Sequence, residues 1–189
     1  MAPSSVLPET FAHAVETLRA VAARPEIVLE DLTAPTRLAP YAHAFSGTVS
    51  RAGDEVATGR LVLLHDPAGQ DAWDGTLRLV TYVTAELEPE LASDPLLPAV
   101  GWSWLTDALA AHGADYTAIG GTVTQTTSTR FGDLAGPPSS ADLEIRASWT
   151  PLSADLGGHC AAWFTLLSST AGLPPPGVTA LAWPAAPGA

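Results

Sequence analysis

The stretch GRLVLLHDPAGQDAWDGTLRLVTYVTAELEPELASDPLLPAVGWSWLTDALAA, residues 59–111, decides the fold of this chain. It contains the end of an apolar segment, residues 55–64, and a second such segment, residues 76–87, whose lengths and alternation predict two β-strands. An acidic polar connection, residues 65–75, separates them. Apolar side chains then recur at helical spacing over residues 99–111, which predicts a helix after the strands.

The flanking segments repeat the same two patterns. Glycine and aspartate in the turn at residues 51–54 favour a hairpin between the strands on either side. Gly120 and Gly121, inside a strand-like segment, indicate a β-bulge. Further strands are predicted over residues 27–32, 41–50, 115–129 and 142–150, and further helices from Glu9 to just before Arg24 and over residues 154–171.

This order of elements predicts an α+β fold. Successive strands joined by short turns form antiparallel sheets, and amphipathic helices need a shared apolar face to cover. We therefore expect a mostly antiparallel sheet of five to six strands and three helices, in the order α-β-βββ-α-ββ-α, with the helices mainly on one face. Residues 1–172 are expected to form a single domain, and residues 173–189 a proline-rich C-terminal tail.

The composition narrows the classes of partner. The formal net charge is −12 and the arginines are scattered singly, whereas phosphate binding needs clustered basic residues, so no nucleic acid is expected. An acidic surface disfavours anionic membranes, and no apolar run is long enough to span one. Cys160 is the only cysteine, and the N-terminus lacks the pattern of a signal peptide. These features predict a cytoplasmic protein without a disulfide.

The connection between the two central strands, HDPAGQDAWDG at residues 65–75, gathers one imidazole, three carboxylates and a tryptophan. Hard cations prefer several oxygen ligands, and transition metals would add the histidine, but the spacing matches neither a calcium loop nor a zinc pattern. Aspartate, glycine and proline are also ordinary residues of a strand connection. Both interpretations stay open. No metal site is predicted, and the candidate ligand-binding side chains are His65, Asp66, Asp71, Trp73 and Asp74.

Two tryptophans are candidates for an interface. On a helix over residues 99–111, Trp102 and Trp104 lie about 200° apart, so they cannot both face one core. Trp102 shares the face of the leucines and is predicted to be buried. Trp104 is left at the margin, against the tail, a second copy, a ligand or its own domain, and Trp183 lies in the apolar tail. Aromatic side chains are enriched in interfaces, which makes Trp104 and Trp183 interface candidates.

Several segments resemble an uncharacterised actinobacterial family, domain of unknown function 3000. They are RLAPYAHA at residues 37–44, GRLVLLHDPAGQDAWDGTLRLVTYV at 59–83, AELEPELASDPLLPAVGWSWLTDAL at 85–109 and EIRASWTPL at 144–152. The resemblance implies an actinobacterial cytoplasmic protein and brings no activity, cofactor or catalytic residue. By element order alone, the chain is also similar to type III secretion chaperones, which are small acidic peptide binders that often dimerise.

Two hypotheses on function follow from these patterns. No nucleophile elbow, phosphate loop or dinucleotide fingerprint is present, which favours a non-enzymatic protein-binding or regulatory domain, chaperone-like and possibly a homodimer, with no cofactor. The alternative is an enzyme or small-ligand binder that uses residues 65–75, with His65 as the acid or base. His159 and Cys160 are adjacent on a helix, where side chains diverge by about 100°, so they are not expected to form a catalytic pair.

Overall fold

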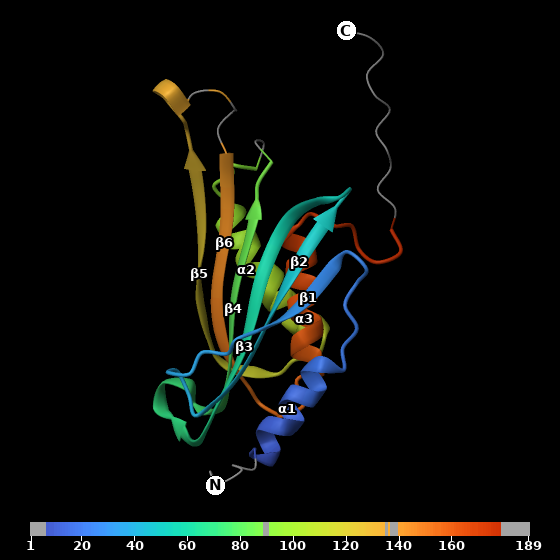
Figure 1. Ribbon diagram of the computed structural model, residues 1–189, viewed down its shortest axis with the longest axis vertical. Helices are drawn as coiled ribbons and strands as arrows, with labels where there is room; N and C mark the ends of the chain where they lie inside the picture. The colour runs from blue at the N-terminus through green and yellow to red at the C-terminus, as the bar shows by residue number, and fades with distance from the viewer. Residues whose placement is uncertain (1–6, 89–90, 135, 137–139, 179–189) are drawn as a thin grey trace.

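One antiparallel sheet carries all the strands of the computed structural model, which describes residues 7–88, 91–134, 136 and 140–178. The order in the sheet is β1-β2-β3-β4-β6-β5, so β1 and β5 form the two edges (Figure 1). Every pair of neighbouring strands is antiparallel. The strands are β1 (Ile27–Leu32), β2 (Tyr41–Arg51), β3 (Asp54–Gln70), β4 (Gly75–Glu86), β5 (Tyr116–Ser128) and β6 (Ser140–Pro151).

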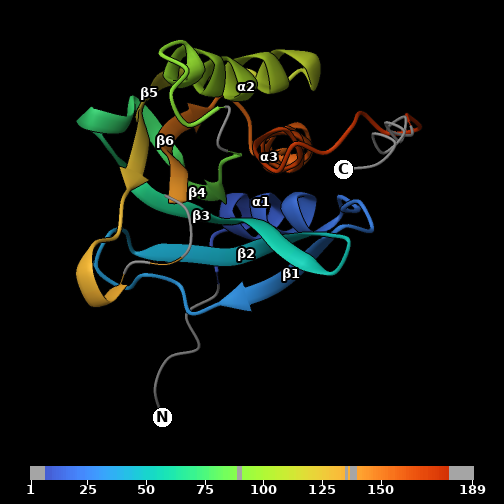
Figure 2. The same ribbon diagram turned by 90° about the horizontal axis from the view of Figure 1, so that it is seen from above.

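Three α-helices cover one face of this sheet. They are α1 (Glu9–Arg19), α2 (Leu97–Ala111) and α3 (Gly157–Thr170), and two short 3-10 helices, η1 (Asp71–Trp73) and η2 (Gly132–Leu134), follow β3 and β5. Seen from above, the sheet curves around the helices, with α3 between α1 and α2 (Figure 2). The predicted α+β fold, its element order and the one-sided helix layer are confirmed.

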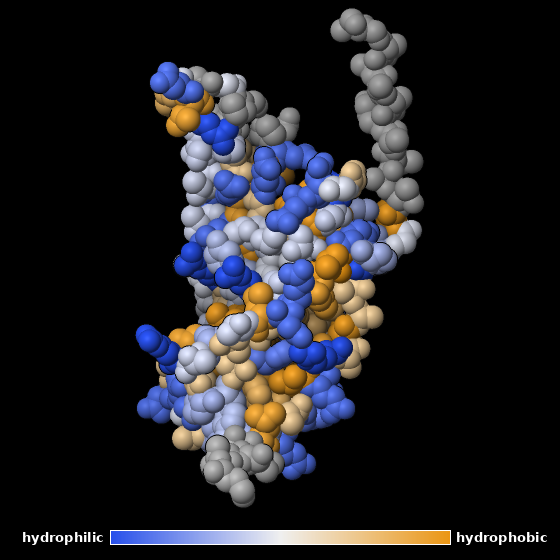
Figure 3. All heavy atoms as spheres, viewed as in Figure 1, coloured by the Kyte–Doolittle hydropathy of each residue, from blue (hydrophilic) through white to orange (hydrophobic). Residues whose placement is uncertain are grey.

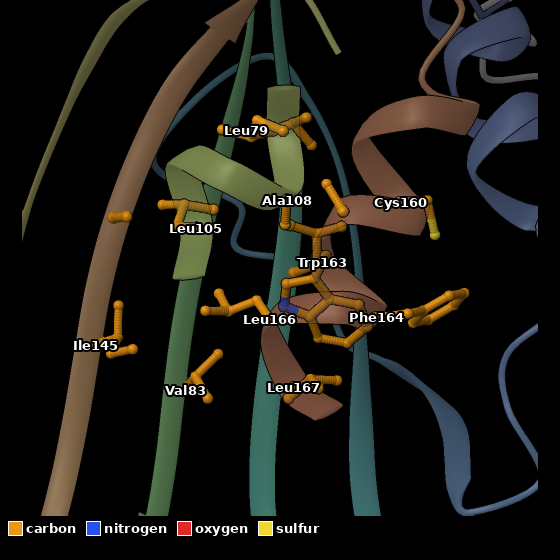
Figure 4. Packing of buried hydrophobic residues seen from close by; sticks show 14 of the residues in the cluster. Leu79, Val83, Leu105, Ala108, Ile145, Cys160, Trp163, Phe164, Leu166 and Leu167 are labelled. Atoms are coloured by element: carbon orange, nitrogen blue, oxygen red, sulfur yellow. The ribbon is translucent and has the colours of Figure 1, made fainter. Parts of the chain in front are cut away.

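Helix α3 fills the centre of the molecule. Its predicted apolar stripe is confirmed, because Leu156, Cys160, Trp163 and Leu167 are all fully buried. Trp163 lies between α2 and the central strands (Figure 4). Its indole Nε1 donates a 2.9 Å hydrogen bond to Thr81 Oγ1 on β4, which satisfies the only polar group of this large side chain.

Two glycines on neighbouring strands make room for α3. Gly47 on β2 and Gly59 on β3 lie opposite each other in the register. A Cβ atom at Gly59 would lie 2.6 Å from Leu167 Cδ2, and one at Gly47 would lie 3.0 Å from both Leu167 and Trp163. The lack of side chains at this paired position therefore lets the helix approach the sheet closely.

The expected alternation of β6 is confirmed, and β5 has its bulge directly before the Gly120–Gly121 pair at which it was predicted. The inward side chains of β6, with Trp149 at the end of the row, are buried. In β5 the register shifts between Thr117 and Gly120, and Ala118 adopts a left-handed φ of 49°. A Cβ at Gly121 would lie 2.2 Å from the carbonyl oxygen of Arg146, so the strand needs glycine to pack against β6 there.

Two predicted boundaries are wrong. Strand β3 runs to Gln70, so most of the expected loop at residues 65–75 is strand, closed by the single turn of η1. The pairing of β3 with β4 is interrupted between His65 and Gln70. The intervening residues of β3 form an irregularity within the strand pair. Helix α1 ends at Arg19 rather than near Arg24, although Val21 beyond it still packs against the core.

The first residues after α3 are held against the helices. Leu173 packs on the core, and Arg24 Nη1 donates a 2.8 Å hydrogen bond to the carbonyl oxygen of Pro174. Residues 179–189 of the expected tail, among them Trp183, lie outside the described residues. Among the helices that the structure describes, none is long and apolar enough to cross a membrane.

Candidate functional site

His65, the expected acid or base, belongs to the core under α1. Only 3% of the residue is exposed, and its Nδ1 lies 3.0 Å from the carbonyl oxygen of Thr76 on β4. Its ring stacks on Phe11 of α1 with centroids 6.1 Å apart, and Tyr41 lies at a similar distance. Burial on the helix side of β3 separates this imidazole from the polar side chains that follow it in the sequence.

The three aspartates of residues 65–75 make local contacts at the connection between β3 and β4. Asp66 accepts hydrogen bonds from the Ala68 backbone N–H at 3.0 Å and from the Gln70 amide at 3.2 Å. Asp74, in the left-handed conformation with φ 55°, accepts a 3.4 Å hydrogen bond from Thr117. Asp71 begins η1 and is exposed. These contacts are those expected of turn residues.

Trp73 closes the same connection through its backbone, because its carbonyl oxygen accepts a hydrogen bond from Thr150 of β6. The structure thus places Asp66, Asp71, Trp73 and Asp74 along one turn but does not bring His65 to them. No three His, Cys, Asp or Glu side chains converge on a metal position anywhere in the described part of the chain. The residues 65–75 also line none of the hollows described below.

Trp104, the other candidate, borders a hollow at the end of the molecule where α3 and β4 finish. The hollow measures about 510 Å³, a size typical of ligand pockets. Trp104 itself is half-buried and also packs against the core. The lining combines apolar and charged side chains: Arg51, Val56, Glu86, Leu87, Glu88, Leu91, Trp104, Ser169, Thr170, Ala171 and Gly172.

The charges of this Trp104 hollow are arranged around Arg51, at the tip of the β2–β3 hairpin. Arg51 Nη2 lies 3.6 Å from Glu88 Oε1, and its Nη1 lies 3.6 Å from the position of a Cβ on Gly172, just beyond α3. A cation at the C-terminal end of a helix is favourable, because the last carbonyls carry partial negative charge. The side chains of Arg51 and Glu88 are 48% and 68% exposed, so a ligand in the hollow can contact either charge.

A second hollow, of about 360 Å³, lies at the start of α3, and His159 forms one wall. Trp149 Nε1 donates a 3.1 Å hydrogen bond to His159 Nδ1, which assigns the ring hydrogen of the neutral imidazole to Nε2. Desolvation by burial lowers the pKa of His159 to about 4, against the weaker opposing effect of Asp115 and Asp155. In this state Nε2 can donate a hydrogen bond but cannot accept a proton, so His159 is not a general base at neutral pH.

Cys160 is a core residue. It is fully buried, and burial raises the pKa of its thiol to about 12. A neutral thiol without access to solvent is neither a nucleophile nor a metal ligand. The sequence argument against a His159–Cys160 pair agrees with this environment, while the bond to Trp149 had no signal in the sequence because it joins a strand to a helix.

Arg78 is the charged residue that sequence reasoning missed. It lies on the face of β4 opposite the helices, is only 9% exposed, and has no carboxylate partner among the described residues. Its guanidinium donates to three neutral oxygens, those of Ala118, Thr150 and Ser148, at 2.7–3.0 Å. The bulge of β5 turns the Ala118 carbonyl towards it. Arg78 therefore ties β4, β6 and β5 together across the sheet.

Comparison with known families identifies one match. The family described as "Protein of unknown function (DUF3000)" matches residues 7–179, which is nearly the whole chain. The chain belongs to the DUF3000 family. The resemblance to domain of unknown function 3000 is thereby confirmed, and the match includes all three helices of the fold. Neither the curated proteins nor the solved structures give a match.

Proposed function

We propose that this DUF3000 protein is a non-enzymatic, chaperone-like protein-binding domain that takes a short extended segment of a partner protein in the Trp104 hollow. The observation that carries the proposal is the composition of the hollow, where aromatic and aliphatic side chains adjoin an exposed pair of opposite charges. Interfaces concentrate their energy in such aromatic anchors, surrounded by polar groups that fix orientation.

The shape of the hollow favours a peptide over a metabolite. It lies at the surface, between the hairpin tip, the end of β4 and the end of α3, so a chain can enter and leave it. Val56, Leu87 and Leu91 offer space for one or two apolar side chains. Arg51 and Glu88 can each pair with a charged side chain or with backbone groups of the bound segment.

The test uses random peptides, so that the sequence of the bound segment need not be chosen in advance. A phage-displayed library of random peptides is selected on the immobilised full chain, and the enriched peptides are synthesised for fluorescence anisotropy. We expect Trp104→Ala to weaken their binding by at least about tenfold, the loss of one aromatic anchor. Charge reversal by Arg51→Glu should change which charged residues the enriched peptides carry.

Trp73→Ala is the matched control. Trp73 is also half-buried, but it lies on η1, between β3 and β4, and not at this hollow. Circular dichroism establishes that both variants are folded. Peptides that bind the Trp104→Ala variant as tightly as the parent protein would refute the proposed site. Loss of binding in Trp73→Ala alone would favour the alternative, a small-ligand or enzyme site near residues 65–75.

That alternative has its own test in the exposed aspartates, because replacing the buried His65 would perturb the core as well. Asp71→Asn and Asp74→Asn remove carboxylates without removing volume. A metal or metabolite that co-purifies with the parent protein in native mass spectrometry and is lost in these two variants would support the alternative over the peptide site.

A further inference from the structure

The two edge strands of the sheet, β1 and β5, differ in how well they are protected against pairing with a strand of another molecule. Strand β1 has only six residues and includes Glu30 and Asp31. Strand β5 has thirteen, YTAIGGTVTQTTS, without a single charged residue or proline. Soluble proteins usually blunt an exposed edge with charge, proline or shortness, because its unpaired N–H and C=O groups would otherwise pair with another strand. β5 has none of these protections and only the bulge near its start.

Strand β5 is also open along most of its length. It is the outermost strand, with η1 near its start and η2 beyond its end (Figure 1). Figure 3 shows its upper part as a pale, weakly polar column at the edge of the molecule. From Gly120 onward most of its residues are exposed, and a Cβ at Gly120 would meet nothing within 4 Å.

We propose that β5 pairs in antiparallel orientation with β5 of a second copy, so that one sheet continues across a two-fold symmetric homodimer. This surface is separate from the Trp104 hollow, and the inference does not rest on the proposed function. Two molecules that each carry a net charge of −12 repel one another, and an uncharged strand is the contact at which that repulsion is smallest.

The charges that flank the strand identify a second copy as the occupant. Asp115 comes directly before β5, and Arg130 follows two residues after its end. Arg130 has no ion pair among the described residues. When two copies of the strand run antiparallel about an axis near Val123, Asp115 of each copy lies beside Arg130 of the other. A parallel arrangement would instead bring like charges together.

Apolar side chains that follow β5 in the chain also meet apolar side chains of the second copy in the antiparallel arrangement. Phe131, directly before η2, and Leu134, its last residue, are 79% and 74% exposed. The antiparallel arrangement carries them to the start of the β5 of the second copy, where Tyr116 and Ile119 are only partly buried. Large exposed apolar residues next to an unpaired strand are typical of an interaction surface.

Sedimentation velocity of the full chain over a concentration series tests the proposal. The parent protein should sediment as a dimer. Thr124→Lys adds a charge at an exposed position of β5, close to its own counterpart across the axis, and should weaken dimerisation at least about tenfold. Val28→Lys adds the same charge at the opposite edge, on a residue that is 57% exposed, and should leave the dimer intact.

Charge reversal supplies a second measurement that does not depend on the strand variants. Asp115→Arg and Arg130→Asp should each weaken the dimer, and the double variant should restore it, because the pair is re-formed between the copies. A parent protein that stays monomeric at its highest soluble concentration overturns the proposal. So does a dimer that Thr124→Lys leaves unchanged, that Val28→Lys abolishes, or that the double reversal fails to restore.

Discussion

Replacement by alanine should lower the free energy of unfolding at Gly121 of β5 but leave it almost unchanged at the adjacent Gly120. A Cβ at Gly121 would lie 2.2 Å from Arg146 O and 2.9 Å from Ala147 Cα, both in the backbone of β6, and 2.8 Å from the Trp102 ring. The half-buried ring can move, but the backbone of a neighbouring strand cannot shift without breaking the ladder. Overpacking of this kind costs about 3 kcal/mol, at the upper end of its usual range.

Gly120→Ala is the matched control. Nothing lies within 4 Å of a Cβ there, so we expect a change within about 0.5 kcal/mol. Urea unfolding followed by tryptophan fluorescence gives both free energies, at one protein concentration so that association does not bias the comparison. Gly121→Ala should also lower the melting temperature by about 6–12 °C for a chain of this size. Equal free energies of unfolding for the two variants would refute the packing argument.

Three further predictions concern the buried polar groups. Thr81→Val keeps the shape of the side chain but leaves the Trp163 indole N–H without its acceptor, so unfolding experiments should show a loss of about 1–3 kcal/mol, whereas a neutral result would mean that another acceptor replaces Thr81. Burial holds the pKa of His159 at about 4 against 6.5, so the unfolded chain binds more protons between these values and stability falls by about 3 kcal/mol as pH falls through this window. His159→Asn, whose carbonyl can still accept from the Trp149 indole, should flatten that pH dependence in urea titrations, and an unchanged slope would assign it to other groups. Cys160, with its pKa raised to about 12, should react with a thiol reagent only at the rate of global unfolding, and rapid labelling of the folded protein would contradict its burial.

Much of the fold follows from local patterns in the sequence. The alternation that ends in Trp149 and the stripe through Trp163 assigned β6 and α3 with their buried faces, because each element packs one face against a single core. The Gly120–Gly121 pair lies directly after the bulge of β5 rather than in it, and Gly121 is needed for another reason, its close approach to the β6 backbone.

The candidate site was harder to predict, because its residues depend on pairing between distant segments. Asp66 is an ordinary loop residue, yet β3 continues past it to Gln70, where pairing with Gly75 of β4 resumes after a gap that begins at His65. His65 faces the core because the register places it opposite Tyr41 and beneath Phe11. The sequence around His65 does not indicate which residue of β2 it pairs with.

Arg78 shows the same limit for charged residues. An arginine at an outward position of a strand normally indicates a solvated face. Here three neutral oxygens from β5 and β6 surround the guanidinium, and burial lowers its pKa. The acceptors come from residues forty or more positions away, so only the assembled sheet reveals them.

The central position of α3 has a consequence for how the protein is made. All six strands and the other two helices precede α3 in the chain, so they leave the ribosome before the helix that covers the middle of the sheet. Thr17 of α1 is joined to the start of α3 across 139 positions of sequence, where its Oγ1 accepts a hydrogen bond from Leu156 N–H. Until residues 157–170 emerge, the nascent chain exposes the apolar face of the sheet that α3 later covers, and exposed apolar surface is what general ribosome-associated chaperones bind.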